Sequence, residues 1–256
     1  FAMECFQKGI LTERETHGLR LEFGNHEAMV EAVRKIAFRE AIGDQMAEGV
    51  ARWSETLGPE AERYAMHVKG LELPAYDPRG AKGMALEYAT SPRGGCHERG
   101  LLSQETFGVK PHVDRLSYEG KPELLRKVQI RTAVLDSLGA CIFPMQNATI
   151  PMEELTDLYA AVTGFSVSTD ELWLAGERIL TLERLFNVRE GFNRRADILP
   201  SRLLEEPLPD GASKGEVVSL SPLLDRYYEV MGWNENGIPT PEKLAQLDLP
   251  QNWQAG

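Results

Sequence analysis

The chain has 256 residues, of which 42% are hydrophobic and 26% are charged, and its formal net charge is −11. This composition is ordinary for a globular protein of one large or two modest domains, and the acidity argues against nucleic-acid binding, because phosphate backbones attract basic surfaces. No apolar run reaches the roughly 18 residues of a membrane span, and only three cysteines occur, far apart, so we expect a cytoplasmic protein with no membrane contact.

The first residues, Phe1-Ala2-Met3-Glu4-Cys5, form a mostly apolar stretch with neither an initiator methionine nor a polar leader. Such a start is typical of the middle of a helix. We therefore expect a fragment of a longer protein, whose N-terminal partner is missing. Apolar faces that this partner would cover should then be exposed, and they would favour self-association into homo-oligomers.

Residues 1–67 have helical periodicity. Asn25 and Asp44 are suitable N-caps, because each is a short polar residue placed before apolar positions spaced three and four apart. Gly43 and Gly58 follow the two periodic runs, so we predict that the two helices end there. A further short helix is expected directly after them.

Residues 68–110 are irregular. Two prolines and a glycine interrupt residues 71–80, and glycines and a proline interrupt residues 91–100, with one short helix expected at 82–89 between them. Long irregular stretches in globular proteins are usually either functional or disordered. The Tyr, Leu, Met, Cys and His side chains in this one favour a functional role.

Helical signals return in the rest of the chain. Pro122 suits the first turn of a helix that runs to about Leu138, Pro151 begins another, and Ser168 with Glu171 forms a capping box before a long one. A loop-rich stretch follows at residues 191–215. Two final helices are then expected to begin at Ser221-Pro222 and at Thr240-Pro241, where a capping residue precedes a proline. We predict an all-α, multihelical protein with long irregular loops, divided into a helical domain at residues 1–67 and another at 68–256.

His97 is the histidine inside the glycine-rich loop at residues 91–100. A histidine in such a loop can reach a ligand and exchange a proton near neutral pH, which suits a general acid or base. The alternative is a solvated or hydrogen-bonded loop histidine. Cys96 and His97 together with Cys141 lack the paired spacing of a structural zinc site.

Asp77 and Arg79 offer a carboxylate and a guanidinium held two residues apart by a proline, which suits an arginine fork for an anionic group. The alternative is an internal pair that only fixes the loop. Arg99 follows His97 by two residues, so the two side chains would face one cavity if the chain is extended there.

The stretch DSLGAC at residues 136–141 follows a predicted helix. Asp136, Gly139 and Cys141 place a carboxylate, bare backbone and a thiol within one corner, which suits a site where backbone approaches a flat ligand while a thiolate holds a metal. The alternative is a helix that ends at a glycine and is followed by a small buried cysteine.

Three stretches together resemble the C-terminal part of the aldehyde:ferredoxin oxidoreductase family: residues 67–79 (HVKGLELPAYDPR), 89–97 (ATSPRGGCH) and 136–141. Shorter supporting matches, in the same order as in the family, occur at residues 2–5, 24–25, 187–192, 199–202 and 227–233. The resemblance runs over nearly the whole chain, and its joint specificity is high although each motif alone is weak.

The resemblance implies a tungsten enzyme with two pterin dithiolenes and a [4Fe–4S] cluster, which oxidises aldehydes to carboxylic acids and reduces ferredoxin. This chain resembles the two helical domains, residues 1–67 being the end of the second domain and 68–256 the third. Asp136 then hydrogen-bonds a pterin edge, Gly139 lets backbone approach the ring, and Cys141 is the last cluster ligand. His97 donates near the tungsten oxo group or the substrate carbonyl, and Arg99 lies against the pterin; Asp77 and Arg79 are further candidates for cofactor contacts.

Most departures from the family concern what precedes Phe1, and one lies within the chain. The Cys-x-x-Cys-x-x-x-Cys motif of the family is absent, so the chain supplies too few cysteines to build the cluster alone, and Ala140 stands where a leucine is usual. We therefore expect this chain to be inactive and free of cofactor by itself, and to need the N-terminal half of the enzyme. Two alternatives stay open: a tungsten-dependent aromatic acyl-CoA reductase subunit, and a non-catalytic helical binding module.

Overall fold

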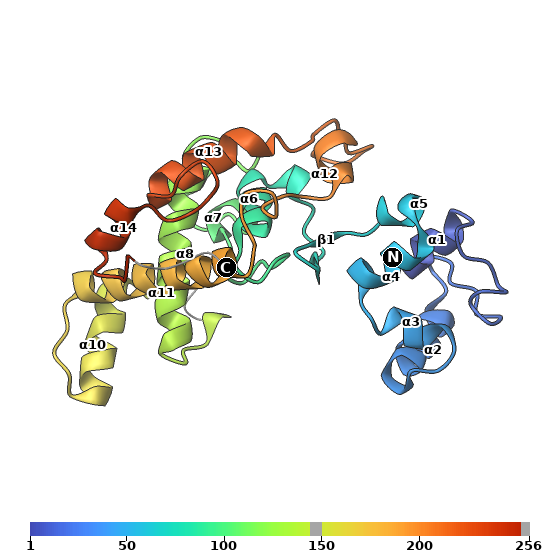
Figure 1. Ribbon diagram of the computed structural model, residues 1–256, viewed down its shortest axis with the longest axis horizontal. Coiled ribbons are helices and arrows are strands. Elements are labelled where there is room, and N and C mark those ends of the chain that lie inside the picture. The colour runs from blue at the N-terminus through green and yellow to red at the C-terminus, as the bar shows by residue number, and fades with distance from the viewer. Residues whose placement is uncertain (144–149, 252–256) are drawn as a thin grey trace.

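The computed structural model describes residues 1–143 and 150–251, and helices dominate these residues (Figure 1). In chain order the elements are α1 (Ala2–Gln7), α2 (His26–Phe38), α3 (Ile42–Met46), α4 (Val50–Leu57), α5 (Pro59–Glu62), β1 (His67–Val68), β2 (Leu71–Glu72), the 3-10 helix η1 (Pro78–Gly80), α6 (Lys82–Thr90), α7 (Ser103–Thr106), α8 (Lys121–Ser137), α10 (Met152–Thr163), α11 (Thr169–Arg189), α12 (Ser201–Glu205), α13 (Leu220–Met231) and α14 (Pro241–Gln246). The prediction of a multihelical, all-α protein is confirmed.

One small sheet interrupts the helices. Strands β1 and β2 pair antiparallel, and Val68 faces Leu71 across a two-residue turn, Lys69-Gly70, in which both residues have positive φ. Two such residues form the turn that matches the twist of a short hairpin. The sequence prediction missed this hairpin, because two residues per strand leave no alternation to detect.

Helices α1 to α5 form a group with its own core, drawn in blue to cyan in Figure 1 and joined to the rest through β1. Asn25 caps α2 as predicted, since its Oδ1 accepts a hydrogen bond from the N–H of Ala28 (3.1 Å). The predicted end at Gly43 is wrong. Arg39 ends the helix in the left-handed region (φ 53°), and the chain turns back at once so that Ile42 is buried in α3.

Two arginine contacts join this group to the C-terminal part of the chain. Arg202 of α12 forms a bidentate salt bridge with the carboxylate of Glu4 in α1 (3.0 and 2.6 Å), and its guanidinium lies 5.0 Å from the centre of the Tyr64 ring. Arg63 pairs with Glu206 (2.7 Å). The assignment of residues 1–67 and 68–256 to separate domains stays a prediction.

The larger core is built around α8, against which α6, α11 and α13 pack. All nine residues of α6 are buried. Gly176 permits the close crossing of α11 over α8, because a Cβ at this position would lie 2.4 Å from the backbone oxygen of Ile130. The α8–α11 crossing fixes where the C-terminal ends of both helices lie, and the candidate site is found there.

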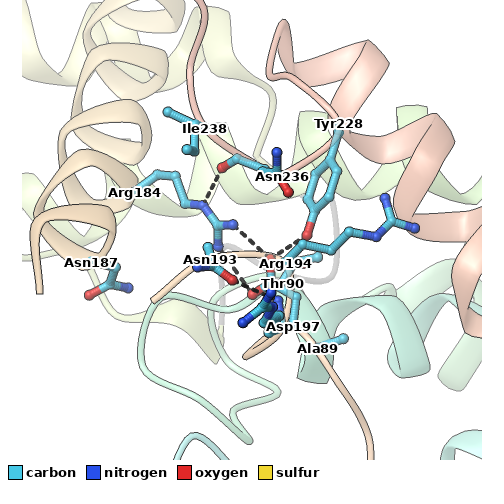
Figure 2. Close-up of polar contacts among 12 residues, drawn as sticks. Ala89, Thr90, Arg184, Asn187, Asn193, Arg194, Asp197, Tyr228, Asn236 and Ile238 are labelled. Atoms are coloured by element: carbon cyan, nitrogen blue, oxygen red, sulfur yellow. Dashed lines mark hydrogen bonds and ion pairs between the residues drawn. The ribbon is translucent and has the colours of Figure 1, made fainter. Parts of the chain in front are cut away.

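A buried ionic cluster centred on Asp197 ties α11 to α13 (Figure 2). Its carboxylate contacts Arg184 of α11 (2.8 Å), Lys69 of the hairpin turn (2.9 Å) and the hydroxyl of Tyr228 on α13 (2.5 Å). Burial by itself raises the pKa of Asp197, but the two cations and the hydroxyl outweigh burial and hold the pKa below its usual range. Lys69 also donates to the backbone oxygen of Ala89 (2.5 Å), so the cluster fixes the hairpin against the end of α6.

Candidate active site

The loop at residues 91–100 is held by close backbone packing at its centre. The N–H of Gly95 donates to the backbone oxygen of Val68 in β1 (3.1 Å). Gly94 has a φ of +100°, and a Cβ there would lie 2.3 Å from the same oxygen. Only glycine combines this conformation with this approach, so the loop lies directly on the hairpin.

The end of the loop packs against α6 and α8. A Cβ at Gly100 would lie 2.2 Å from Oε2 of Glu87 and 2.6 Å from the side chain of Leu125, so no side chain fits there either. Glu87 is fully buried and accepts a hydrogen bond from Nε2 of Gln129 (2.8 Å). Burial raises the pKa of Glu87 to about 8, which keeps this carboxyl largely neutral at pH 7.

His97 lies half-buried between the fixed centre and the fixed end of the loop. Its ring rests against the ring of Tyr76, with centroids 5.3 Å apart, and Tyr76 in turn contacts Phe107 at 6.4 Å. The hydroxyl of Tyr88 donates to the backbone oxygen of Tyr76 (3.1 Å), which holds Tyr76 in place from the core. Sequence reasoning did not single out Tyr76, and the 21 positions that separate it from His97 give no local signal.

Arg99 joins the loop to α8 and α11. It pairs with Asp136 at the end of α8, a residue 37 positions away, and its Nη2 lies 3.4 Å from Oε1 of Glu183 on α11. Burial raises the pKa of the Glu183 carboxyl, with Asp136 adding to the effect while Arg99 opposes it. The side chain of Asp136 remains 45% exposed, so part of its carboxylate faces outward beyond Arg99.

The end of α8 is open. Gly139 has a φ of +65° and nothing within 4 Å of where a Cβ would be, and Cys141 is exposed. The alternative of a small buried cysteine after the helix is therefore wrong for this thiol. A carboxylate, an uncovered stretch of backbone and an accessible thiol thus follow one another along this end of the helix.

Asp77 and Arg79 form a pair of their own. Asp77 caps η1 through the N–H of Arg79 (2.9 Å) and binds its guanidinium (2.6 Å), while Nη1 of Arg79 donates to the backbone oxygen of Glu206 (2.7 Å). Arg79 is 9% exposed, so its guanidinium is committed to the protein. This geometry favours the internal pair over an arginine fork for an external anion.

Within residues 1–143 and 150–251, no group of three or more His, Cys, Asp and Glu side chains is placed so that it could bind a metal ion. Among these same residues, no helix combines the length and the apolar character needed to cross a membrane.

Residues 1–249 match the family described as aldehyde ferredoxin oxidoreductase, domains 2 and 3. The tungsten-containing aldehyde ferredoxin oxidoreductases of Pyrococcus horikoshii and Thermococcus kodakarensis are 41% and 40% identical over 98% of this chain. A Pyrococcus furiosus protein named aliphatic sulfonate oxidoreductase, WOR-like subunit, is 31% identical over 97% of the chain.

A solved structure is similar over 97% of this chain, with a TM-score of 0.71 and 25% identity: the active site complex BamBC of benzoyl coenzyme A reductase in complex with 1,5-dienoyl-CoA. The chain spans about two fifths of the length of these similar proteins: 42% of the Pyrococcus horikoshii protein and 42% of the benzoyl coenzyme A reductase chain.

Proposed function

Because the chain belongs to the aldehyde ferredoxin oxidoreductase family, we propose that it is the C-terminal part of a tungsten pterin and iron–sulfur oxidoreductase. The whole enzyme oxidises aldehydes to carboxylic acids and passes the electrons to ferredoxin. The observation that carries this proposal is the arrangement at the end of α8, where Arg99 and Asp136 meet beside the exposed Gly139 and Cys141.

These residues fit the cofactors by their chemistry. An exposed carboxylate such as Asp136 accepts hydrogen bonds from the amino group and ring N–H of a pterin, and the uncovered backbone at Gly139 allows a flat ring to approach. The accessible thiol of Cys141 suits iron in a cluster. When bound, the tungsten pterin supplies the two-electron oxidation, and the cluster carries the electrons away one at a time.

The part that this chain plays in the reaction centres on His97. Its imidazole donates a hydrogen bond to the carbonyl oxygen of the aldehyde and so favours addition of a water molecule, the source of the second carboxylate oxygen, at the carbonyl carbon. The ring of Tyr76 holds the imidazole from one side (5.3 Å) and, with Phe107, forms an apolar wall for the aldehyde. Arg99 balances the charge of Asp136 next to the cofactor.

The N-terminal half of the enzyme is the partner that this chain requires. An apolar groove of about 320 Å³ opens on the first helical group, beside large exposed side chains of α2 and the loop before it: Phe23, Met29, Val30, Val33 and Phe38. Exposed apolar patches on soluble proteins mark surfaces that bind another part. A chain that spans two fifths of its relatives leaves ample polypeptide to cover this groove.

The test is to express the chain alone and together with the N-terminal half, and to measure tungsten, iron and visible absorption in both. We expect the metals only in the combined protein, with aldehyde-dependent reduction of ferredoxin. Cys141→Ala should lose iron, whereas Cys5→Ala should retain it, because burial raises the pKa of the Cys5 thiol to about 11. Stoichiometric tungsten in the chain alone, or full iron in Cys141→Ala, would contradict the proposal.

The structural similarity to benzoyl coenzyme A reductase favours a second candidate, a reductase of aromatic acyl-CoA. The combined protein should therefore be assayed with both substrate classes. Turnover of an aromatic acyl-CoA without turnover of aldehydes would replace the first candidate with the second. Absence of metal and of both activities would leave a non-catalytic helical binding module.

A further inference from the structure

We propose that Asn187 and Glu183 of α11 are positioning residues, which clamp the loop at residues 91–100 at both ends and thereby place His97. The catalytic consequence rests on the proposed function, whereas the clamp itself rests on the contacts of this chain. Asn187 contacts Pro92 and Glu183 contacts Arg99, so each acts on His97 through the loop.

The two ends of the loop are held from one face of one helix. Nδ2 of Asn187 donates to the backbone oxygen of Pro92 (2.9 Å), and Oε1 of Glu183 lies 3.4 Å from Nη2 of Arg99. Residues four apart lie one turn above each other on a helix, so both anchors belong to the same stripe of α11. Pro92 and Arg99 bracket His97 in sequence.

The middle of the loop is held by the hairpin. The backbone at Gly94 and Gly95 lies against the hairpin, with the N–H of Gly95 on Val68 (3.1 Å). Cys96 is buried, and its sulfur accepts a hydrogen bond from the N–H of Glu98 (3.4 Å). Once α11 and the hairpin fix these points, His97 has little freedom except rotation of its side chain.

Arg99 makes the clamp depend on the crossing of two helices. Its guanidinium contacts both Asp136 of α8 and Glu183 of α11, so its position follows the relative placement of these two helices. That placement is set by the close approach at Gly176, which admits no Cβ. The clamp therefore transmits the α8–α11 geometry to the loop that carries His97.

The first experiment measures the clamp without any cofactor. Amide hydrogen exchange is followed in this chain and in Asn187→Asp, which keeps the shape but loses the donor, and Glu183→Gln, which loses the charge. We expect exchange at residues 91–100 to accelerate about tenfold or more in both variants, because opening of the loop becomes easier when an anchor is lost. Unchanged exchange in both variants would overturn the clamp.

Matched controls separate this effect from a general change in α11. Glu190→Gln changes an exposed carboxylate just past the same helix, and Asn236→Asp changes an exposed residue that contributes to the fold through its backbone. Both should leave exchange at residues 91–100 as in the unaltered chain. Equal acceleration in the controls would show that the clamp residues have no special role.

The second experiment tests whether the clamp acts through His97 in the chain combined with its N-terminal half. A misplacement of about 1 Å in a catalytic group can cost about 100-fold in rate, so we expect Asn187→Asp to lower kcat about tenfold with KM unchanged. In a His97→Ala background the same substitution should cause no further loss. A full additional loss there would overturn positioning through His97. If His97→Ala itself keeps normal kcat, the proposed role of His97 fails, while hydrogen exchange still decides the clamp.

Discussion

Replacing Asp197 with asparagine should destabilise the protein strongly, because it removes the single carboxylate that Arg184 and Lys69 share. Both cations are only 4% exposed, and they lie 2.8 and 2.9 Å from its oxygens. An amide fills the same space but carries no charge, so two buried cations would lose the carboxylate that balances them and keep only neutral partners such as the backbone oxygens of Ala89 and Gly237. Loss of one partner of a buried ion pair costs about 3–5 kcal/mol in free energy of unfolding.

That cost is large beside the total of about 5–15 kcal/mol for a folded domain, and at about 2–4 °C per kcal/mol it corresponds to roughly 10 °C in Tm. Guanidinium chloride unfolding, followed by circular dichroism at pH 7, measures it. The matched control is Asp225→Asn, whose carboxylate pairs with Arg194 (2.6 Å) but is 62% exposed. An exposed pair is worth about 0–1 kcal/mol, so this control should change stability little.

The pH dependence provides an internal check. The pKa of Asp197 is lowered in the folded protein, so its stabilising contribution is present above the pKa of an unfolded aspartate, about 3.9. The contribution is lost as pH falls through the lower, folded value. The advantage of Asp197 over Asp197→Asn should therefore be constant from pH 5 to 7 and shrink below pH 4. A cost under about 1 kcal/mol at pH 7 would refute the reasoning, because it would fall in the range of an exposed pair.

Two further substitutions test the loop and the carboxyl beneath it. The pKa of Glu87 is raised to about 8, so the stability contributed by its protonated carboxyl is fully present below the pKa of an unfolded glutamate and is lost as pH rises toward 8. In urea titrations, the free energy of unfolding of Glu87→Gln should therefore rise relative to that of the unaltered protein by about 1 kcal/mol per pH unit between pH 5 and 8. A pH-independent difference would contradict this. Gly94→Ala places a Cβ 2.3 Å from a backbone oxygen at positive φ and should cost about 2–4 kcal/mol in thermal unfolding, whereas Gly120→Ala, with open space around it, should cost only about 1 kcal/mol for its positive φ.

Local signals in the sequence predicted local structure well. Asn25 and the Ser168–Glu171 capping box cap their helices as expected, since each interaction spans only three residues. The end of α2 was misplaced because burial of Ile42 turns the chain at Arg39, a residue with no turn preference. Tertiary contacts of this kind leave no mark in the neighbouring sequence.

The candidate site was accessible to sequence reasoning only through the family resemblance. Nothing local predicts that Arg99 meets Asp136 across 37 positions, although the resemblance assigned both to the same cofactor. Asn187 lies within one of the supporting matches but received no role, and Glu183 was not singled out, because polar residues on a long helix look alike whether they face solvent or a loop. The fate of Asp77 and Arg79 shows the converse: a suggestive pair in the sequence binds itself in the fold.

The glycines of the loop at residues 91–100 also limit how this protein can be altered. Positions 94, 95 and 100 have no room for any side chain, so a library that varies the whole loop would consist mostly of misfolded members. Arg93 and Glu98 are exposed and flank the same turn as His97. Variation of this loop should therefore be confined to residues 93 and 98, with the loop backbone kept unchanged.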